Sequence, residues 1–112
     1  MTVTAAKGFR AAGVTAGIKA SGKPDVAVVI NDGPRFTAAG VFTSNRFKAA
    51  PVLWSEQVLD DHHLRAVLLN SGGANACTGT AGFADTHRSA EFVASRLSDL
   101  GIETGAGEVA VC

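Results

Sequence analysis

The sequence predicts an α/β fold, an α+β sandwich in which a mixed sheet with one hairpin packs with one long helix. Three observations predict it. Residues 25–30 form a short run rich in branched apolar side chains, and residues 64–69 form a second apolar run that ends in a glycine-rich loop. Residues 83–100 have the apolar spacing of a helix. The length of 112 residues suits about one small domain with a single core.

The first half of the chain predicts a hairpin. Residues 25–30 read D-V-A-V-V-I, which is typical of a strand buried on both faces. The turn residues N-D-G-P follow at 31–34, and residues 36–43 are predicted to be the partner strand. Before the hairpin, residues 8–19 contain three glycines, which disfavours a helix and indicates a loop with a short strand.

The next elements are predicted to be short. Residues 50–54, which include Pro51, are expected to form a third strand, and Ser55 is a candidate cap for a brief helix over residues 56–59. A charged loop then leads to the strand at residues 64–69.

The second half predicts a strand, a loop, a long helix and a final strand. The loop covers residues 70–82 and holds four glycines. Gly101 is the expected end of the helix. The last residues, 108–112, form a strand-like run with no polar tail. We interpret this ending as a sign that the chain is a piece of a longer protein. The helix presents one apolar face, made of Phe83, Ala90, Val93, Ala94, Leu97 and Leu100.

Composition excludes several classes of protein. Apolar residues make up 46% and charged residues 18%, which argues against disorder. The net charge is zero and no basic block is present, so no nucleic-acid partner is expected. No apolar run approaches the roughly 20 residues that cross a membrane, and the N-terminus does not resemble a signal peptide. Two cysteines are too few for a disulfide scaffold, which favours a cytoplasmic location.

The glycine-rich loop at 70–82 is the first place to look for chemistry. A strand, a small-residue loop and a helix are also the parts of phosphate-binding sites, where backbone amides near the helix start meet an anion. However, the spacing fits neither G-x-G-x-x-G nor the P-loop pattern, and the loop contains no lysine. An anion- or nucleotide-binding module is therefore kept as the alternative function.

Other catalytic patterns are weak. The histidines and cysteines that could bind a soft metal ion are His62, His63, His87, Cys77 and Cys112. Their spacing matches no zinc-binding pattern, so no metal is expected. Cys77 precedes the long helix, where a thiolate would be stabilised, but a small buried cysteine is the favoured interpretation. Asp60 and Asp61 are adjacent and point in different directions, so they form no acid/base pair.

Five stretches, in the right order, resemble the ornithine acetyltransferases, also called glutamate N-acetyltransferases. The loop at 70–79, N-S-G-G-A-N-A-C-T-G, resembles the family's N-S-G-N-A-N-A-x-T-G motif. Residues 108–112 resemble the strand just before the family's S-T-G motif. The sequence as a whole is most similar to actinobacterial members. The other three stretches are G-F-R-A-A-G with G-I-K at 8–19, A-G-V-F-T-S-N at 39–45 and K-A-A-P-V at 48–52.

The resemblance implies acetyl transfer from N-acetylornithine to glutamate in arginine biosynthesis, and some members also use acetyl-CoA as the donor. Such enzymes cleave themselves into an alpha and a beta chain. The cut exposes a threonine nucleophile at the start of the beta chain. The two chains stay together, commonly as a heterotetramer. Residues 1–112 would be an N-terminal segment of the alpha chain, an incomplete domain whose partners are the rest of that chain and the beta chain.

The family's catalytic groups cannot be placed on this sequence. The Thr-Gly pair of the oxyanion hole would come just after Cys112, and the nucleophilic threonine would come later still. No catalytic residue, metal ligand or cofactor is therefore expected within residues 1–112. The candidates for substrate-adjacent positions are Asn70, Gly72 and Gly73. Gly73 stands where the family commonly has asparagine.

Overall fold

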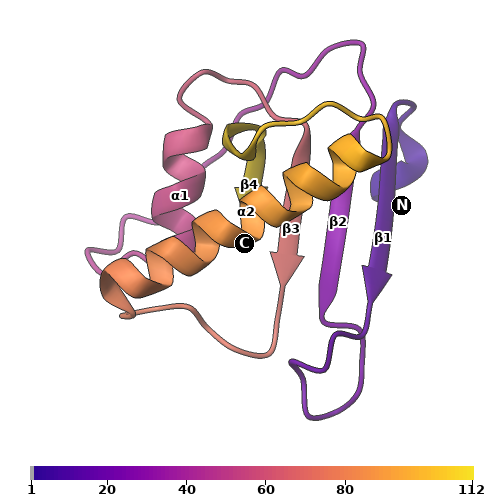
Figure 1. Cartoon of the computed structure of the whole chain (residues 1–112). Helices are drawn as coiled ribbons and strands as arrows, with labels where there is room; N and C mark the ends of the chain where they lie inside the picture. The colour runs from indigo at the N-terminus through magenta and orange to yellow at the C-terminus, as the bar shows by residue number, and fades with distance from the viewer. Residues whose placement is uncertain (1) are drawn as a thin grey trace.

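The protein folds as a four-stranded mixed sheet with a long helix across one face, seen in a computed structural model that describes residues 2–112 (Figure 1). The strand order is β1-β2-β3-β4, in which the β1–β2 and β2–β3 pairs are antiparallel and the β3–β4 pair is parallel. The predicted fold class is thus confirmed. The elements are a short 3-10 helix (Val3–Ala5), β1 (Phe9–Val14), β2 (Val26–Asn31), α1 (Ala50–Val58), β3 (Ala66–Asn70), α2 (Gly79–Asp99), a second 3-10 helix (Ala106–Glu108) and β4 (Val109–Val111).

Helix α2 connects the parallel strands β3 and β4 and supplies much of the core. It buries Ala90, Val93, Ala94 and Leu97 of the predicted apolar face. Phe83 is partly buried against this core, but Leu100, at the end of the helix, is 75% exposed, so its place in the apolar face was wrongly predicted. It begins at Gly79, four residues before the predicted start, so the end of the glycine-rich stretch is helical. The helix ends as predicted at Gly101, whose φ of +82° suits a glycine and whose N–H donates to the Ser98 carbonyl at 2.9 Å.

The hairpin exists, but its strands differ from the predicted pair. β2 pairs with β1 on one side and β3 on the other, which makes it a central strand. A nearly continuous apolar strand gains most from two neighbours, and the segments at 9–14 and 66–70 supply them. The predicted partner at 36–43 forms only an isolated bridge, between Thr37 and His63.

The predicted strand at residues 50–54 is wrong, because this segment is the first half of α1. Pro51 lies in the first turn of the helix, where its fixed φ is favourable and its missing N–H costs nothing. The predicted short helix at 56–59 is the continuation of α1. Ser55 is therefore an interior helix residue and does not cap a helix.

Helix α1 covers the free edge of β4. The Trp54 indole Nε1 donates to the Val109 carbonyl at 2.8 Å. The Ser55 hydroxyl donates to the Val111 carbonyl at 2.8 Å and accepts from the Val111 N–H at 3.0 Å. Without α1, these backbone N–H and C=O groups at the edge of β4 would be buried and unpaired. The core around this contact comprises Trp54, Val58, Ala66, Ala90, Val93, Ala94, Leu97, Val109, Ala110 and Val111.

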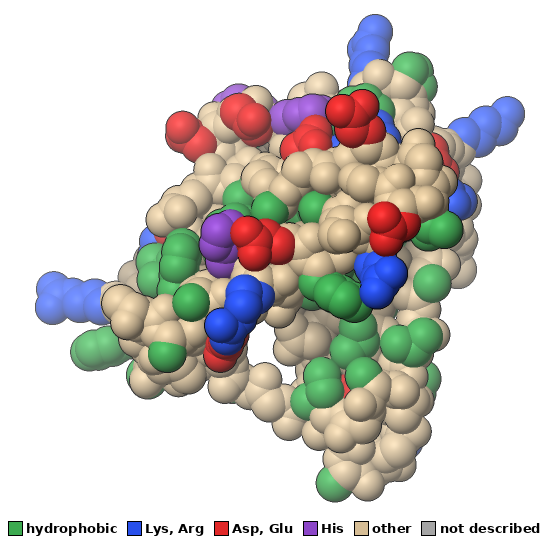
Figure 2. Space-filling model, in the orientation of Figure 1, with side chains coloured by type: hydrophobic (Ala, Val, Ile, Leu, Met, Phe, Trp, Pro, Cys, Tyr) green, Lys and Arg blue, Asp and Glu red, His purple; other side chains and the backbone are tan. Residues whose placement is uncertain are grey.

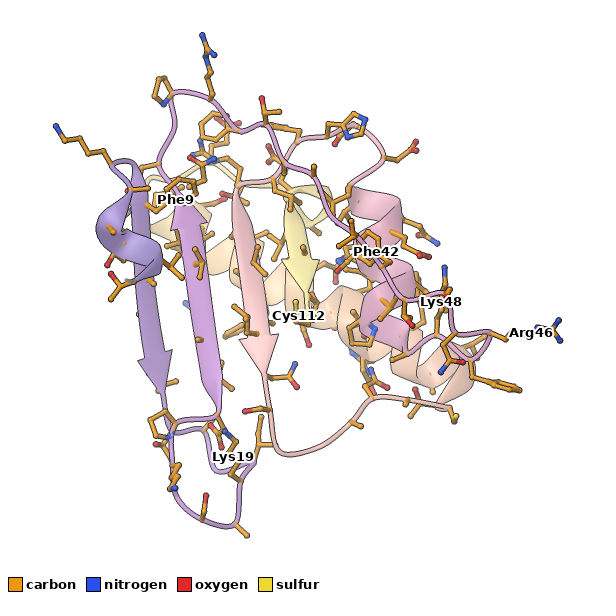
Figure 3. The ribbon with its side chains drawn as sticks, turned by 180° about the vertical axis from the view of Figure 1, so that it is seen from behind. Phe9, Lys19, Phe42, Arg46, Lys48 and Cys112 are labelled. Atoms are coloured by element: carbon orange, nitrogen blue, oxygen red, sulfur yellow. The ribbon has the colours of Figure 1, made fainter. Side chains whose placement is uncertain are left out.

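The two faces of the sheet are covered differently. Helix α2 crosses the front face, with acidic, basic and histidine side chains along its outer surface (Figure 2). Seen from behind, the short 3-10 helix Val3–Ala5 lies over β1, and no α-helix from residues 2–112 lies in front of the sheet (Figure 3). This explains why β2 is half-buried along its whole length and not buried on both faces as predicted. Within residues 2–112, every helix is too short or too polar to cross a membrane.

Candidate functional site

The carboxyl ends of β3 and β4 bring Asn70 and Cys112 together. Because the two strands are parallel, both end at the same edge of the sheet. The Asn70 backbone N–H and its side-chain Nδ2 both donate to the Cys112 carbonyl, at 3.0 and 3.1 Å. The Cys112 N–H donates to the Leu68 carbonyl at 2.8 Å. The Cys112 backbone is therefore held at its N–H by Leu68 and at its carbonyl by Asn70.

A cavity of about 280 Å³ lies at this edge. The connection between β1 and β2 forms its second wall and carries Lys19 at the same end of the sheet (Figure 3). Segments from three regions of the sequence thus meet here, which makes this edge the candidate functional site. The cavity is lined by Gly13, Pro24, Asp25, Val26, Ala27, Leu69, Asn70, Ser71 and Cys112.

Asp25 holds the β1–β2 connection in shape. Its carboxylate is buried and accepts backbone N–H groups from Ala16 at 2.6 Å, Ile18 at 2.6 Å and Lys19 at 2.9 Å. These hydrogen bonds, chiefly the one from Ala16, lower the pKa of the Asp25 carboxyl below its ordinary value. The Asp25 carbonyl also accepts the Ser71 N–H at 2.8 Å. Asp25 therefore ties the connection to the glycine-rich loop, a role that the sequence pattern did not indicate.

This lowered pKa predicts a pH dependence of stability. A carboxyl with a lowered folded-state pKa stabilises the fold above its unfolded value of about 3.9, and the stabilisation is lost as pH falls through the folded value. Asp25→Asn should therefore lower the melting temperature at pH 7, and its difference from the wild type should shrink below about pH 4. Thermal denaturation across this range measures both. The control is Asp99→Asn, which removes an exposed carboxylate; a pH-independent effect at Asp25 would contradict the assignment.

Gly72 is in close contact with the same connection. Its φ is +113°, and a Cβ atom there would lie 2.8 Å from Lys19 Cγ and 3.1 Å from the Ile18 carbonyl carbon. Gly73 differs, because a Cβ on it would meet only Ile18 Cγ2, at 3.9 Å. A side chain therefore fits at position 73, where the resembling family commonly has asparagine, but not at position 72.

This contrast gives a matched pair of variants. Gly72→Ala is expected to destabilise the protein by about 1–3 kcal/mol, because the new side chain is strained and meets the backbone of residue 18. Gly73→Ala should change the free energy of unfolding by less than about 0.5 kcal/mol. Denaturant unfolding of the two variants compares them directly, and equal losses would show that the contact with Ile18 does not matter.

The rest of the loop is fixed by Asn75. Its Nδ2 donates to the Gly82 carbonyl at 2.8 Å and to Thr86 Oγ1 at 3.0 Å, and its Oδ1 accepts the Thr78 hydroxyl at 2.5 Å. A Cβ on Gly82 would overlap Thr78 Oγ1, so only glycine fits there. The N-A-x-T-G part of the motif therefore has a structural role, which its spacing alone did not reveal.

The remaining candidates do not converge on one site. Cys77 is exposed, so the interpretation as a buried cysteine is wrong. His87 stacks on Trp54, with ring centroids 4.8 Å apart, and lies 3.5 Å from Glu91. His63 lies 3.4 Å from Glu108. No three histidine, cysteine or acidic side chains within residues 2–112 gather as metal ligands, and the absence of a metal stays a prediction.

The comparisons with known proteins agree on one family. A family model described as the ArgJ family matches residues 10–112. The chain is 72% identical over 110 residues to the arginine biosynthesis bifunctional protein ArgJ of Mycobacterium tuberculosis, covering 98% of this chain. It is 70% identical over 112 residues to that of Streptomyces coelicolor, covering 100% of this chain. The chain spans only 27% and 28% of the length of these curated relatives.

Solved structures match as well. The crystal structure of an ornithine acetyltransferase from Mycobacterium tuberculosis, complexed with ornithine, superposes with a TM-score of 0.97 at 72% identity. The match covers 98% of this chain and 57% of that one. The arginine biosynthesis bifunctional protein ArgJ of Bacillus halodurans superposes with a TM-score of 0.83 at 33% identity, over 99% of this chain and 55% of that one.

Proposed function

Because this chain belongs to the ArgJ family of arginine biosynthesis enzymes, we propose that it is part of an acetyltransferase that moves acetyl from N-acetylornithine to glutamate. In this reaction a threonine hydroxyl attacks the acetyl carbonyl, ornithine leaves, and the glutamate amine then takes the acetyl group. The threonine lies outside residues 1–112. Acetyl-CoA is a second candidate donor, and neither a metal nor a bound cofactor is needed.

The observation that carries this proposal is the pair of hydrogen bonds from Asn70 to the Cys112 carbonyl. The resemblance implies that the oxyanion-hole Thr-Gly pair would come just after Cys112. An oxyanion donor must be held in place before the reaction, because its value depends on preorganisation. Asn70 would thus act as a positioning residue: it fixes the peptide that leads into the donors and does not touch the acetyl group.

Gly72 and Gly73 would have supporting roles beside the same site. The close approach at Gly72 brings the β1–β2 connection against the loop, next to the cavity that Asn70 and Ser71 line. Gly73 leaves room for a side chain, in ordinary contact with Ile18, where the related motif carries asparagine. The remaining alpha chain and the beta chain, arising by self-cleavage in the cytoplasm, would complete the site in a hetero-oligomer.

An acetyl-transfer assay tests the proposal. The complete protein that carries this segment should convert N-acetylornithine and glutamate into ornithine and N-acetylglutamate, measured by mass spectrometry. The 112-residue chain purified alone is the control and should be inactive. Failure of the complete protein would refute the reaction, and activity of the 112-residue chain would refute the location of the nucleophile.

The alternative is an anion- or nucleotide-binding module at the loop. A cavity of about 510 Å³ does lie at Thr78 and Gly79, and Lys48 lines it. However, the Lys48 ammonium already pairs with Glu56 at 2.5 Å, which leaves little positive charge for an anion. Calorimetry of the complete protein with phosphate, ATP and acetyl-CoA separates the hypotheses, since tight binding of ATP would favour the module.

A further inference from the structure

Residues 39–44, the exposed segment, have the sequence of a strand but no strand partner. They read A-G-V-F-T-S, and the pattern predicts a strand over 36–43. In the structure the only ladder contact near them, within residues 2–112, is the isolated bridge between Thr37 and His63. Sequence preference and structure therefore disagree at this segment.

The backbone of the exposed segment is unpaired within residues 2–112. Backbone-to-backbone hydrogen bonds stop at Ala38, whose N–H donates to the His62 carbonyl at 2.8 Å, and resume at the Ala49 carbonyl, which accepts from Val52 and Leu53. The N–H and C=O groups of residues 39–44 have no protein partner in this part of the molecule. Such a row of free donors and acceptors is what a strand edge presents to another chain segment.

The segment is nevertheless held against the rest of the protein. A Cβ on Gly40 would lie 2.8 Å from Leu59 Cδ1, at the end of α1. Phe42 and Lys48 lie beside α1, whereas Arg46 projects away from it (Figure 3). The other side faces outward: Val41 is 100% exposed and Phe47 is 81% exposed. One side is thus packed while apolar groups on the other have no cover.

Nothing in the segment protects it from pairing. Natural edge strands are blunted by lysine, proline or an inward charge, and residues 39–45 contain none of these. The Mycobacterium tuberculosis relative has much more polypeptide than this chain, since residues 1–112 span 27% of it. That additional polypeptide is the available source of a partner.

We propose that residues 39–44 form a strand in the complete protein, paired with a strand from the same protein outside residues 1–112. The free backbone groups would form the ladder, as in strand addition. Val41 and Phe47 would be covered by the layer to which the partner strand belongs. The proposal concerns assembly and does not depend on the acetyl-transfer reaction, so an inactive enzyme would leave it intact.

Hydrogen exchange and photocrosslinking of the complete protein test this proposal. At least two amides between 40 and 44 should exchange roughly 100-fold or more slowly than in an unstructured peptide of the same sequence. A photoreactive p-benzoylphenylalanine in place of Val41 should crosslink to a peptide from outside residues 1–112. The amides of β2 are the internal reference for paired strands.

Three results would overturn it. One is exchange of the amides at 40–44 as fast as in the unstructured peptide. Even with a crosslink at position 41, this rate would show a contact without a strand. Another is a crosslink to residues 39–44 of a second copy, which would identify an interface between copies. The third is no crosslink at all, which would leave Val41 in solvent.

Discussion

Replacing Ser55 with alanine is expected to lower the free energy of unfolding by about 2–4 kcal/mol. Its hydroxyl pairs both the N–H and the C=O of Val111, and these groups are buried at the edge of the sheet. Alanine would leave both backbone groups without partners. The better helix propensity of alanine offsets only about 0.5 kcal/mol of this loss.

The matched control for this variant is Ser95→Ala, on the exposed side of α2. It makes the same chemical change in a helix without uncovering a buried group, so it should be neutral or slightly stabilising. Denaturant unfolding of both variants gives the comparison. Equal stabilities would show that α1 does not satisfy the edge of β4, and the description of this edge would have to be changed.

Replacing Asn70 with aspartate should lower kcat of the complete enzyme by about 10–100-fold, with little change in melting temperature. The carboxylate is nearly isosteric with the amide, but it cannot donate to the Cys112 carbonyl and would repel it. The peptide that leads to the proposed oxyanion donors would then move, and small displacements of catalytic groups are costly. KM should change less than kcat, because ground-state binding does not use the oxyanion donors.

The Ser95→Ala variant is also the control for Asn70→Asp. It alters an exposed side chain on α2, outside the candidate site, and should leave kcat within about twofold of wild type. Steady-state kinetics with N-acetylornithine and glutamate measure both variants. If Asn70→Asp kept full kcat, the Cys112 carbonyl would not need Asn70, and the proposed positioning role would be lost.

The fold could be predicted where one residue pattern decided the local structure. The periodic apolar face fixed α2, and the branched apolar runs fixed β2 and β3. Local pattern failed at residues 50–54, where Pro51 suits both a strand start and the first turn of a helix. Tertiary contact decided this case, since only a helix places Trp54 and Ser55 on the edge of β4.

The pairing of the strands could not be predicted from the local sequence pattern for a related reason. The turn residues at 31–34 suggested that β2 pairs with the segment after it, but pairing depends on which strands can bury a common face. β1 and β3 fill both positions beside β2, so residues 36–43 were left without a place in this sheet. The exposed segment at 39–44 is the result.

The candidate site was predicted only as a location. Glycine density marked the loop, and the resemblance selected Asn70, Gly72 and Gly73. The hydrogen bonds of Asn70, the contact at Gly72 and the Asn75 network all depend on segments far apart in the chain. No spacing rule could place Asp25 beside Ser71, because the contact arises from the β1–β2 connection folding onto the loop.

The central claim is that residues 1–112 position the site without carrying its nucleophile. Identifying the residue that becomes acetylated is the most direct test of this claim. The complete enzyme is mixed with N-acetylornithine in the absence of glutamate, quenched, and its chains and peptides are analysed by intact mass and peptide mapping. We predict one acetyl group on a threonine at the start of a second chain, and none within residues 1–112. Acetyl found on Cys77 or Cys112 would contradict the claim.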